Sequence, residues 1–300
     1  MTPVRDIRRV AVVGAGIMGS GIAQLAATAG YDVALYDATP QQLERAREGI
    51  NASIEKLVAK GRLAAEEGEQ ALSRLRLCTT LGDAAADADL VVEAVVEALQ
   101  VKQAVLVEAA AAAKPDAVLA TNTSQLSITS IASAVGDGAA RVIGLHFFNP
   151  AVLMRLVEVV PGLQTSDDVV VAACRFATSL GKETVVCRKD SPGFLTSRIS
   201  AIVRLECLRM LEEGVGTAED IDRALRLGLN FPIGPLELGD RNGLDTYLRV
   251  LESLTETLGE RFRPTVGLRN LVAAGRLGRK SGRGIYEYGD DGEIRSPSGS

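Results

Sequence analysis

A single histidine, His146, is the only imidazole in this 300-residue chain that could move a proton. It ends an apolar run that is typical of a buried strand, and Glu158 interrupts a second apolar run farther along. A carboxylate can orient an imidazole and stabilise its protonated form. Ser124, in a polar turn of Thr, Asn and Ser, could add a hydroxyl. Spacing alone does not separate a catalytic set from a core histidine, a solvent-facing glutamate and an N-cap serine.

A glycine-rich turn near the N-terminus has the spacing of a dinucleotide-binding site. Gly14, Gly16 and Gly19 come after a short apolar run and before an alanine-rich helical segment. The first glycine permits a tight turn, the second lets a pyrophosphate approach the backbone, and the third lets the helix pack on the strand. Ile17 and Met18 lie in the same turn, where the helix N-terminus faces the phosphates.

Asp37 completes this unit, because it follows the next apolar run, residues 32–36. Strand, glycine turn, helix and strand form a βαβ unit, and this context favours a nucleotide site over a glycine-rich turn without a ligand. A carboxylate there accepts hydrogen bonds from a ribose 2′-hydroxyl and repels a 2′-phosphate. No arginine follows it, since the next residues are Ala38 and Thr39. We therefore expect NAD rather than NADP.

Strand and helix patterns alternate along the first 187 residues, which is typical of a parallel sheet covered by helices. From Ser191 onward only helical patterns appear, and Pro192 suits the first turn of a helix. The expected fold class is α/β: a Rossmann-type dinucleotide-binding domain followed by an all-helical C-terminal domain. The expected ranges are 1–187 for the NAD-binding domain with a helical arm at about 41–75, 188–288 for the helical domain and 289–300 for a flexible tail; single helices are expected over 64–75 and 235–258.

Composition and charge exclude several kinds of partner. The formal net charge is −5 and no basic run occurs, so nucleic acid is not an expected partner. One histidine cannot form a zinc site of several histidines, and the four cysteines contain no Cys-x-x-Cys pair, so no metal is expected. The cysteines are typical of reduced thiols, no apolar run reaches membrane-spanning length, and the N-terminus lacks a signal-peptide pattern. We expect a cytoplasmic protein without a membrane partner.

Several longer motifs resemble those of the L-3-hydroxyacyl-CoA dehydrogenases. The most specific is the block His-Phe-Phe-Asn-Pro at residues 146–150, together with its spacing to Glu158. The resemblance extends over about residues 8–288. The segments that carry it are 12–23, 93–97 with Lys102, 121–124, 146–150 with 156–159, 190–194, 232–235, 243–245 and 278–284.

The resemblance implies an NAD-dependent enzyme that oxidises L-3-hydroxyacyl-CoA to 3-ketoacyl-CoA and catalyses the reverse. A short acyl chain such as that of 3-hydroxybutyryl-CoA is expected. His146 would remove the proton of the 3-hydroxyl as hydride leaves C3, with Glu158 orienting the imidazole and Ser124 hydrogen-bonding the substrate oxygen. Four positions match residues that contact the dinucleotide in the family: Glu97, Lys102, Asn149 and Lys280.

Two residues of the expected arm, Ser53 and Lys60, match the family's CoA-contacting helix. They are seven residues apart, which is about two helical turns, so they share one face. The alternative for Lys60 is a solvated lysine at a helix C-terminus, where the helix dipole favours a positive charge.

One departure from the family pattern is Ser197, which stands where the family has a catalytic Asn before an Arg. A serine can still donate one hydrogen bond but lacks the amide carbonyl. The family's helical domain forms a dimer contact, so a homodimer is expected. Two alternatives stay open: a related dehydrogenase acting on a 3-hydroxy acid without CoA, such as a sugar acid or a carnitine-like compound, and a non-catalytic nucleotide-binding protein.

Overall fold

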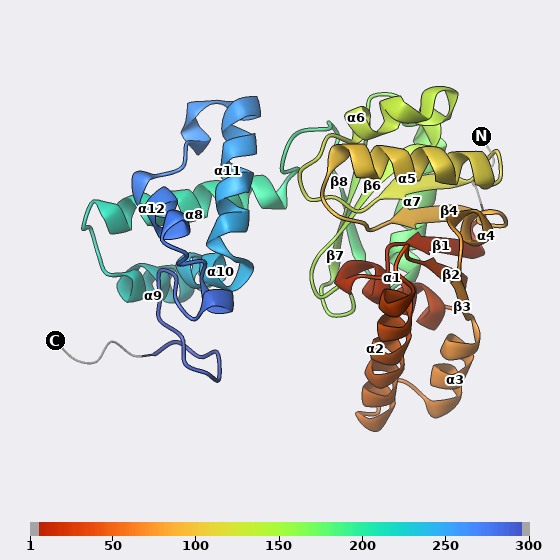
Figure 1. Cartoon of the computed structure of the whole chain (residues 1–300), viewed down its shortest axis with the longest axis horizontal. Coiled ribbons are helices and arrows are strands. Elements are labelled where there is room, and N and C mark those ends of the chain that lie inside the picture. The colour runs from red at the N-terminus through yellow and green to blue at the C-terminus, as the bar shows by residue number, and fades with distance from the viewer. Residues whose placement is uncertain (1–5, 296–300) are drawn as a thin grey trace. The chain divides into compact units, whose positions relative to one another are not determined.

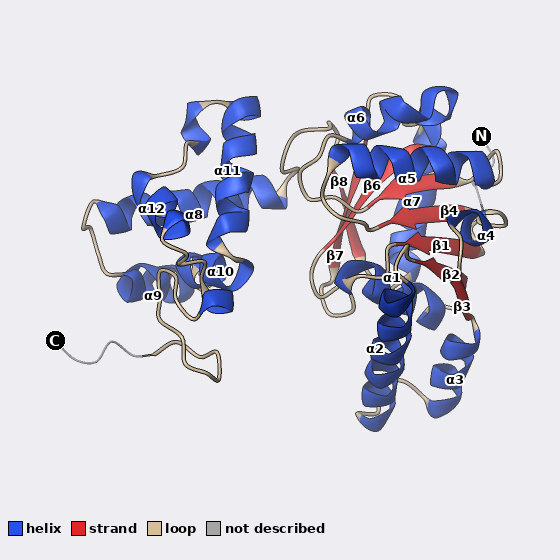
Figure 2. Cartoon of the chain, viewed as in Figure 1, coloured by secondary structure: helices blue, strands red, loops and turns tan. Residues whose placement is uncertain are grey.

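The computed structural model describes residues 6–295. The chain divides into two compact units between Phe194 and Leu195, and each is described by itself below. Figures 1 and 2 show a unit of strands and helices and a unit made of helices. Residues 187–194 follow the last strand but belong to the first unit, because Cys187 and Phe194 pack into its core.

The first unit is built on an eight-stranded sheet with the order β3-β2-β1-β4-β5-β6-β7-β8. Neighbouring strands are parallel except for β6 and β7, which are antiparallel. The strands are β1 (Arg9–Val13), β2 (Asp32–Tyr36), β3 (Leu75–Cys78), β4 (Leu90–Glu93), β5 (Val118–Thr121), β6 (Val142–Phe147), β7 (Leu156–Pro161) and β8 (Glu183–Val186).

Helices cover both faces of this sheet, so the central strands are apolar on both sides. Along β1, Val10 and Val12 pack into the core on one face, whereas Ala11 and Val13 pack into the core on the other. The first core includes side chains from α1 (Ile17–Thr28), α2 (Pro40–Ala59), α3 (Ala65–Ser73) and α7 (Asp167–Ser179), and the second includes side chains from α4 (Leu81–Ala85), α5 (Leu99–Ala112), α6 (Ile128–Ala132) and the 3₁₀ segment η1 (Ser133–Arg141).

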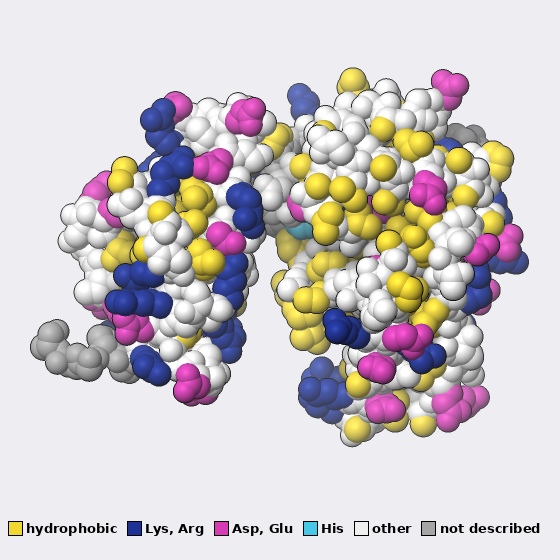
Figure 3. Space-filling view, in the orientation of Figure 1, with side chains coloured by type: hydrophobic (Ala, Val, Ile, Leu, Met, Phe, Trp, Pro, Cys, Tyr) yellow, Lys and Arg dark blue, Asp and Glu magenta, His cyan; other side chains and the backbone are white. Residues whose placement is uncertain are grey.

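The helices α2 and α3 lie side by side at one end of the first unit (Figure 1). Ile54 and Val58 of α2 lie close to Gly68 of α3, where an added Cβ would lie 3.1 Å and 3.2 Å from their methyl carbons. Charged side chains of both signs gather on this part of the surface (Figure 3). The two helices occupy residues 40–59 and 65–73, and their role as an arm of the site stays a prediction.

Two expected elements differ from the structure. The helix expected over 64–75 ends at Ser73, and the chain then forms β3, whose pairing with β2 is a non-local contact that helical periodicity does not reveal. The helix expected over 235–258 is two helices, α10 (Pro235–Asn242) and α11 (Leu244–Leu258). Gly243 separates them with a φ of 93°, a conformation that glycine adopts without steric cost.

The second unit packs its helices around a core that includes Leu205, Leu236, Leu251 and Phe262. Besides α10 and α11 it contains α8 (Thr196–Glu212), α9 (Ala218–Gly228), α12 (Val266–Ala273) and the short 3₁₀ segments η2 (Glu260–Phe262) and η3 (Arg279–Ser281). Up to residue 295 this unit has isolated bridges but no strand of a sheet.

The expected tail begins at residue 289. Tyr288 and Ile294 form an antiparallel bridge, so the chain up to Arg295 pairs back on itself. The last part of that tail, residues 296–300, lies outside the described residues. Within residues 6–295 no helix is long and apolar enough to cross a membrane.

Candidate active site

The sheet topology brings the residues singled out by sequence to one edge. Because β1, β4, β5 and β6 run parallel, their carboxyl ends lie on the same side, and the segments after them include Gly14, Glu97, Ser124 and Asn149. The chain order reverses between β1 and β4, which is where open α/β sheets form a ligand crevice. The candidate site is therefore the loop cluster at this edge of the first unit.

The glycine turn has the geometry that the motif requires. Gly14 has a φ of 100°, and a Cβ there would lie 2.8 Å from the carbonyl oxygen of Ala94. A Cβ on Gly19 would lie 1.7 Å from the carbonyl oxygen of Gly14. Gly16, at the start of α1, has no atom within 4 Å of such a Cβ, so the space beside its backbone is open. Ile17 is 77% exposed beside this open space.

Asp37 follows β2 and holds the glycine turn. Its Oδ2 accepts a hydrogen bond from the Ala15 N–H at 2.8 Å, and its Oδ1 accepts one from the Thr39 N–H at 2.8 Å. Each carboxylate oxygen has a second lone pair, so these bonds leave capacity for a ribose hydroxyl. Asp37 thus shapes the turn as well as offering the charge that disfavours a 2′-phosphate.

The glycine geometry predicts opposite outcomes for two alanine substitutions. Gly19→Ala places a methyl inside the contact with the Gly14 carbonyl, so we expect a loss of about 3 kcal/mol or more in the free energy of unfolding. Gly16→Ala has a compatible φ of −68° and open space, so its stability should match wild type while the methyl occupies the approach to the pyrophosphate. We expect its Kd for NAD to rise about tenfold or more. Urea unfolding measures the free energy of unfolding, and calorimetric titration measures the Kd for NAD. Wild-type NAD affinity in Gly16→Ala would contradict the placement of the pyrophosphate.

His146 and Glu158 face each other across the one antiparallel pair of the sheet in the described chain. The register aligns His146 of β6 directly with Glu158 of β7. Directly opposite residues in an antiparallel pair have Cβ atoms about 5 Å apart. Here His146 Nδ1 lies 2.6 Å from Glu158 Oε2. The histidine is 7% exposed and the glutamate is fully buried, so this hydrogen bond is shielded from competing water.

Aromatic rings enclose the imidazole. The ring of Phe148 lies 4.4 Å from that of His146 between centroids, and the ring of Phe194 lies 5.8 Å away. When the Nδ1–H donates to Glu158, Nε2 carries the lone pair and is the atom available for proton transfer. This geometry would suit an imidazole that acts as a general base.

Ser124 lies in the turn after β5, and Glu97 anchors this turn. Glu97 Oε1 accepts hydrogen bonds from the Ser124 N–H at 3.0 Å and from the Thr123 hydroxyl at 2.5 Å. The Ser124 hydroxyl lies 3.5 Å from the same oxygen. Asn122 Oδ1 accepts a hydrogen bond from the Phe147 N–H at 3.0 Å, which ties the turn to the strand that carries His146.

Lys102 lies beneath this turn and has no exposed surface. Its Nζ donates to Glu93 Oε1 at 3.0 Å and to the Asn122 carbonyl at 3.0 Å, and it lies 3.5 Å from Glu97 Oε2. Burial raises the pKa of the Glu93 carboxyl, while the charge of Lys102 acts in the opposite direction. In this structure Lys102 positions Glu97 and the turn; a direct contact with the dinucleotide stays a prediction.

Sequence reasoning did not single out Glu93, Thr121 or Asn122 as parts of the site. Glu93 ends a buried strand, and Thr121 donates a hydrogen bond to its Oε1. A buried carboxylate needs partners of this kind, because an unpaired charge in the interior is costly. The available signal was a glutamate closing an otherwise apolar run.

The remaining predicted residues are dispersed over the fold. Asn149 is exposed in the segment after β6. Ser53 is half-buried on α2, and Lys60 is exposed at the end of that helix. Ser197, in the first turn of α8, and Lys280 belong to the second unit, where Lys280 Nζ lies 2.6 Å from Asp245 Oδ1.

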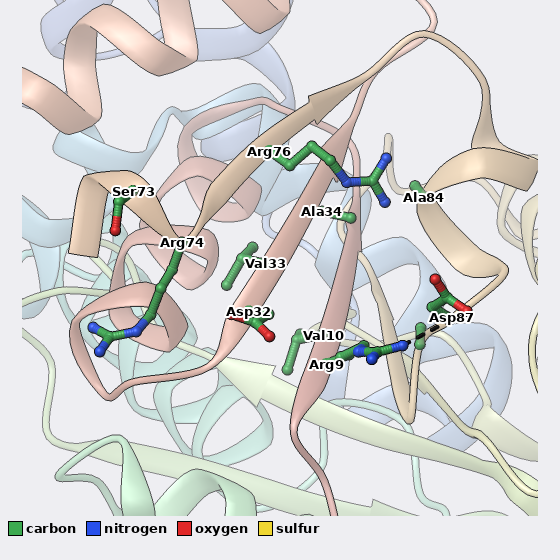
Figure 4. Close-up of a pocket in the computed structure, with 11 residues that line it drawn as sticks. Arg9, Val10, Asp32, Val33, Ala34, Ser73, Arg74, Arg76, Ala84 and Asp87 are labelled. Carbon is green, nitrogen blue, oxygen red and sulfur yellow. Dashed lines mark ion pairs between the residues drawn. The ribbon is translucent and has the colours of Figure 1, made fainter. Parts of the chain in front are cut away.

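A separate hollow of about 290 Å³ lies at the opposite edge of the sheet (Figure 4). Arg9 and Asp32 begin β1 and β2 there, and Arg74 and Arg76 flank the start of β3. Arg9 pairs with Asp87 at 3.6 Å, and both side chains are more than half exposed. Because this hollow adjoins the amino ends of the strands, we assign it no part in the chemistry at His146. Within residues 6–295 no cluster of His, Cys, Asp and Glu could hold a metal ion.

Comparison with known proteins decides the family. Residues 9–191 match the NAD-binding domain of 3-hydroxyacyl-CoA dehydrogenase, and residues 193–288 match its C-terminal domain. The chain belongs to the 3-hydroxyacyl-CoA dehydrogenase family. This membership confirms the predicted family, the Rossmann-type domain followed by a helical domain, the class of enzyme and the NAD cofactor.

Individual relatives cover most of the chain. It is 45% identical over 92% of its length to a probable 3-hydroxybutyryl-CoA dehydrogenase of Deinococcus radiodurans, covering 99% of that protein. It is also 45% identical over 94% of its length to the 3-hydroxyadipyl-CoA dehydrogenase of Escherichia coli, but it spans only 59% of that longer protein. The crystal structure of (S)-3-hydroxybutyryl-CoA dehydrogenase from Ralstonia eutropha superposes with a TM-score of 0.91 at 40% identity, covering 95% of this chain and 100% of that one.

Proposed function

We propose that this 3-hydroxyacyl-CoA dehydrogenase oxidises the 3-hydroxyl of short L-3-hydroxyacyl-CoA esters such as 3-hydroxybutyryl-CoA, and reduces the 3-ketoacyl-CoA in the reverse direction. The observation that carries the proposal is the 2.6 Å contact of His146 Nδ1 with the buried Glu158 carboxylate. It lies at the same sheet edge as the glycine turn. A base and a dinucleotide site at one edge are what coupled proton and hydride removal from an alcohol requires.

The residues of this chain divide the work of the reaction. NAD, when bound, supplies the hydride acceptor. Glu158 accepts the Nδ1–H of His146 and so leaves the lone pair on Nε2, which takes the proton of the 3-hydroxyl. The carboxylate then stabilises the imidazolium that forms. Ser124 donates its hydroxyl hydrogen to the substrate oxygen, from a turn that Glu97 holds in place.

The direction of the reaction depends on pH. Oxidation of the alcohol releases one proton, so the equilibrium shifts toward the ketone by roughly tenfold for each pH unit of increase. In the reductive direction the protonated His146 returns its proton to the oxygen at C3.

The substrate's CoA part is assigned to the arm. Ser53 lies on α2, and Lys60 lies at the C-terminal end of that helix on the same face. Lys56 and Arg62 add positive charge nearby. We assign the CoA phosphates to this end, because lysine and arginine side chains bind phosphate through charge-assisted hydrogen bonds. Lys280 and Asn149 complete the assigned dinucleotide contacts, and Ser197 takes the place of the family's Asn with its single hydroxyl.

We also propose that the enzyme is a cytoplasmic homodimer. The helical unit, which matches the family's C-terminal domain, is the surface through which we propose a homodimer. A cytoplasmic location agrees with four free cysteines and with the lack of a membrane-crossing helix among the described residues.

A substrate panel tests the proposal. We expect oxidation of NADH by acetoacetyl-CoA with a kcat/KM at least about 100-fold above that with NADPH, because Asp37 repels the 2′-phosphate. Free 3-hydroxybutyrate with NAD should be turned over far more slowly than 3-hydroxybutyryl-CoA. Clear turnover of a free 3-hydroxy acid without activity on any CoA ester would overturn the assignment in favour of a dehydrogenase of free acids, and NAD binding without turnover would favour a non-catalytic protein.

A further inference from the structure

The second unit contains a buried arginine without a carboxylate partner. Arg204, on α8, is 8% exposed, and the described residues give it no ion pair. Its Nη2 donates to the Ser200 hydroxyl at 2.9 Å, and its guanidinium carbon lies 4.5 Å from the centroid of the Tyr247 ring. Its Nε is enclosed without a hydrogen-bond acceptor.

This guanidinium lines an apolar pocket of about 430 Å³ within the second unit. The apolar walls include Ile199, Val203, Phe231, Pro232, Ile233 and Leu238. The polar lining residues are Thr196, Ser200 and Arg204, which lie four residues apart along α8 and therefore share one face of the helix. Pockets of this size, with mostly apolar walls and few polar groups, are typical of small-molecule sites.

Burial makes the isolated charge unfavourable. Loss of hydration lowers the pKa of the Arg204 guanidinium, and Tyr247 and Cys207 act in the opposite direction. An anion in the pocket would offset this cost, and a carboxylate matches a guanidinium in both shape and charge. The Nη1 group makes no hydrogen bond to the described residues and, unlike Nε, is not fully enclosed, so it can donate to such a ligand. The apolar walls favour a carboxylate attached to a hydrocarbon chain over a hydrated inorganic anion.

We propose that this pocket, which we call the Arg204 pocket, binds a hydrocarbon chain that ends in a carboxylate. Two sources share this chemistry: the acyl chain of a substrate whose far end carries a carboxyl group, and a separate fatty acid anion. The first would extend the proposed function to 3-hydroxyacyl-CoA esters of dicarboxylic acids. The second would make the pocket an independent binding site.

Calorimetric titration of the whole protein with octanoate tests the shared chemistry without any enzyme assay. Wild type should bind octanoate at least about tenfold more tightly than octanol, and Arg204→Met should lose that difference. Arg204→Lys should retain part of it, because the lysine keeps the charge but not the planar fork. Arg223→Met is the matched control, since Arg223 is 64% exposed on α9, outside the pocket, and pairs with Asp220. Thermal unfolding should show that Arg204→Met folds, because an apolar side chain replaces an unpaired buried charge.

Kinetics distinguish the two sources. If the substrate chain fills the pocket, Arg204→Met should lower kcat/KM for 3-hydroxyadipyl-CoA about tenfold or more while that for 3-hydroxyhexanoyl-CoA changes less than about twofold. If both substrates respond alike while octanoate binding depends on Arg204, the ligand is a separate carboxylate. The proposal would be overturned if octanoate did not bind, or if it bound Arg204→Met as tightly as wild type. If octanoate did not bind and the dimer dissociation constant of Arg204→Met rose, Arg204 would be assigned to a subunit contact instead. Because the titration uses no substrate, its failure is distinct from a failure of the proposed dehydrogenase activity.

Discussion

Replacement of His146 by Gln is expected to lower kcat for 3-hydroxybutyryl-CoA oxidation by about 10³-fold. General acid–base catalysis by a positioned side chain contributes on the order of 10²–10⁴-fold, and the chain has no second imidazole to take over. Gln is close to His in size and can still accept a hydrogen bond, but it cannot hold a proton at neutral pH. NADH formation, followed by absorbance, gives kcat and the KM values for NAD and for 3-hydroxybutyryl-CoA.

The glycine turn should be unchanged in this variant, because among the described residues Asp37 holds it by a hydrogen bond to Ala15 and not through His146. The KM for NAD is therefore expected to stay within about twofold of wild type, since only an interaction made in the transition state is lost. Wild-type turnover in His146→Gln would remove His146 from the chemistry. A rise of the KM for NAD with an unchanged kcat would give it a binding role instead.

Replacement of Glu158 by Gln is expected to lower kcat by about 10²-fold or more. The substitution keeps the shape of the side chain but removes the negative charge that stabilises the imidazolium 2.6 Å away. If the new amide turns its NH₂ toward His146, it donates to Nδ1 and favours the tautomer that carries its proton on Nε2. In that tautomer Nε2 has no lone pair and cannot accept the proton of the substrate. Both effects reduce proton transfer without touching the substrate.

Glu183→Gln serves as the matched control for this substitution. Glu183 begins β8, beside the strand of Glu158, and its side chain is 71% exposed in an ion pair with Arg155. Exposed pairs contribute about 0–1 kcal/mol, so the control should keep kcat within about twofold and lose little stability. Equal losses of activity in both variants would show that Glu158 acts through general stability rather than through His146.

Local patterns made the NAD cofactor and the shape of the glycine turn predictable from the sequence. Gly14 and Gly19 carry steric requirements that any βαβ unit of this kind imposes, and the structure shows both directly, whereas Gly16 leaves open space beside its backbone. The switch from alternating elements to helices near residue 190 likewise indicated two units. The sequence also placed Asp37 at the end of β2, but not its hydrogen bond to Ala15, which depends on how the turn folds back.

Non-local pairing explains what the sequence could not show. Spacing could not bring His146 and Glu158 together, because their contact depends on β7 running antiparallel to β6 in one register. A shift of one residue would point Glu158 to the other face of the sheet. The pairing of β3 with β2 is also non-local. The buried ion pair of Lys102 with Glu93 likewise depends on the packing of α5 against β4, which the sequence does not show. Spacing left the role of His146 open, and the catalytic role proposed for it comes from the family resemblance.

A double-mutant cycle on His146→Gln and Glu158→Gln, measured as kcat for 3-hydroxybutyryl-CoA oxidation, tests the central claim most directly. If Glu158 acts only by orienting and stabilising the imidazole, its loss should matter little once the imidazole is gone. The double variant is then expected to fall within about threefold of His146→Gln alone. Losses that multiply, giving a double variant slower by the product of the two single effects, would show that the residues act independently and would contradict a His146–Glu158 dyad.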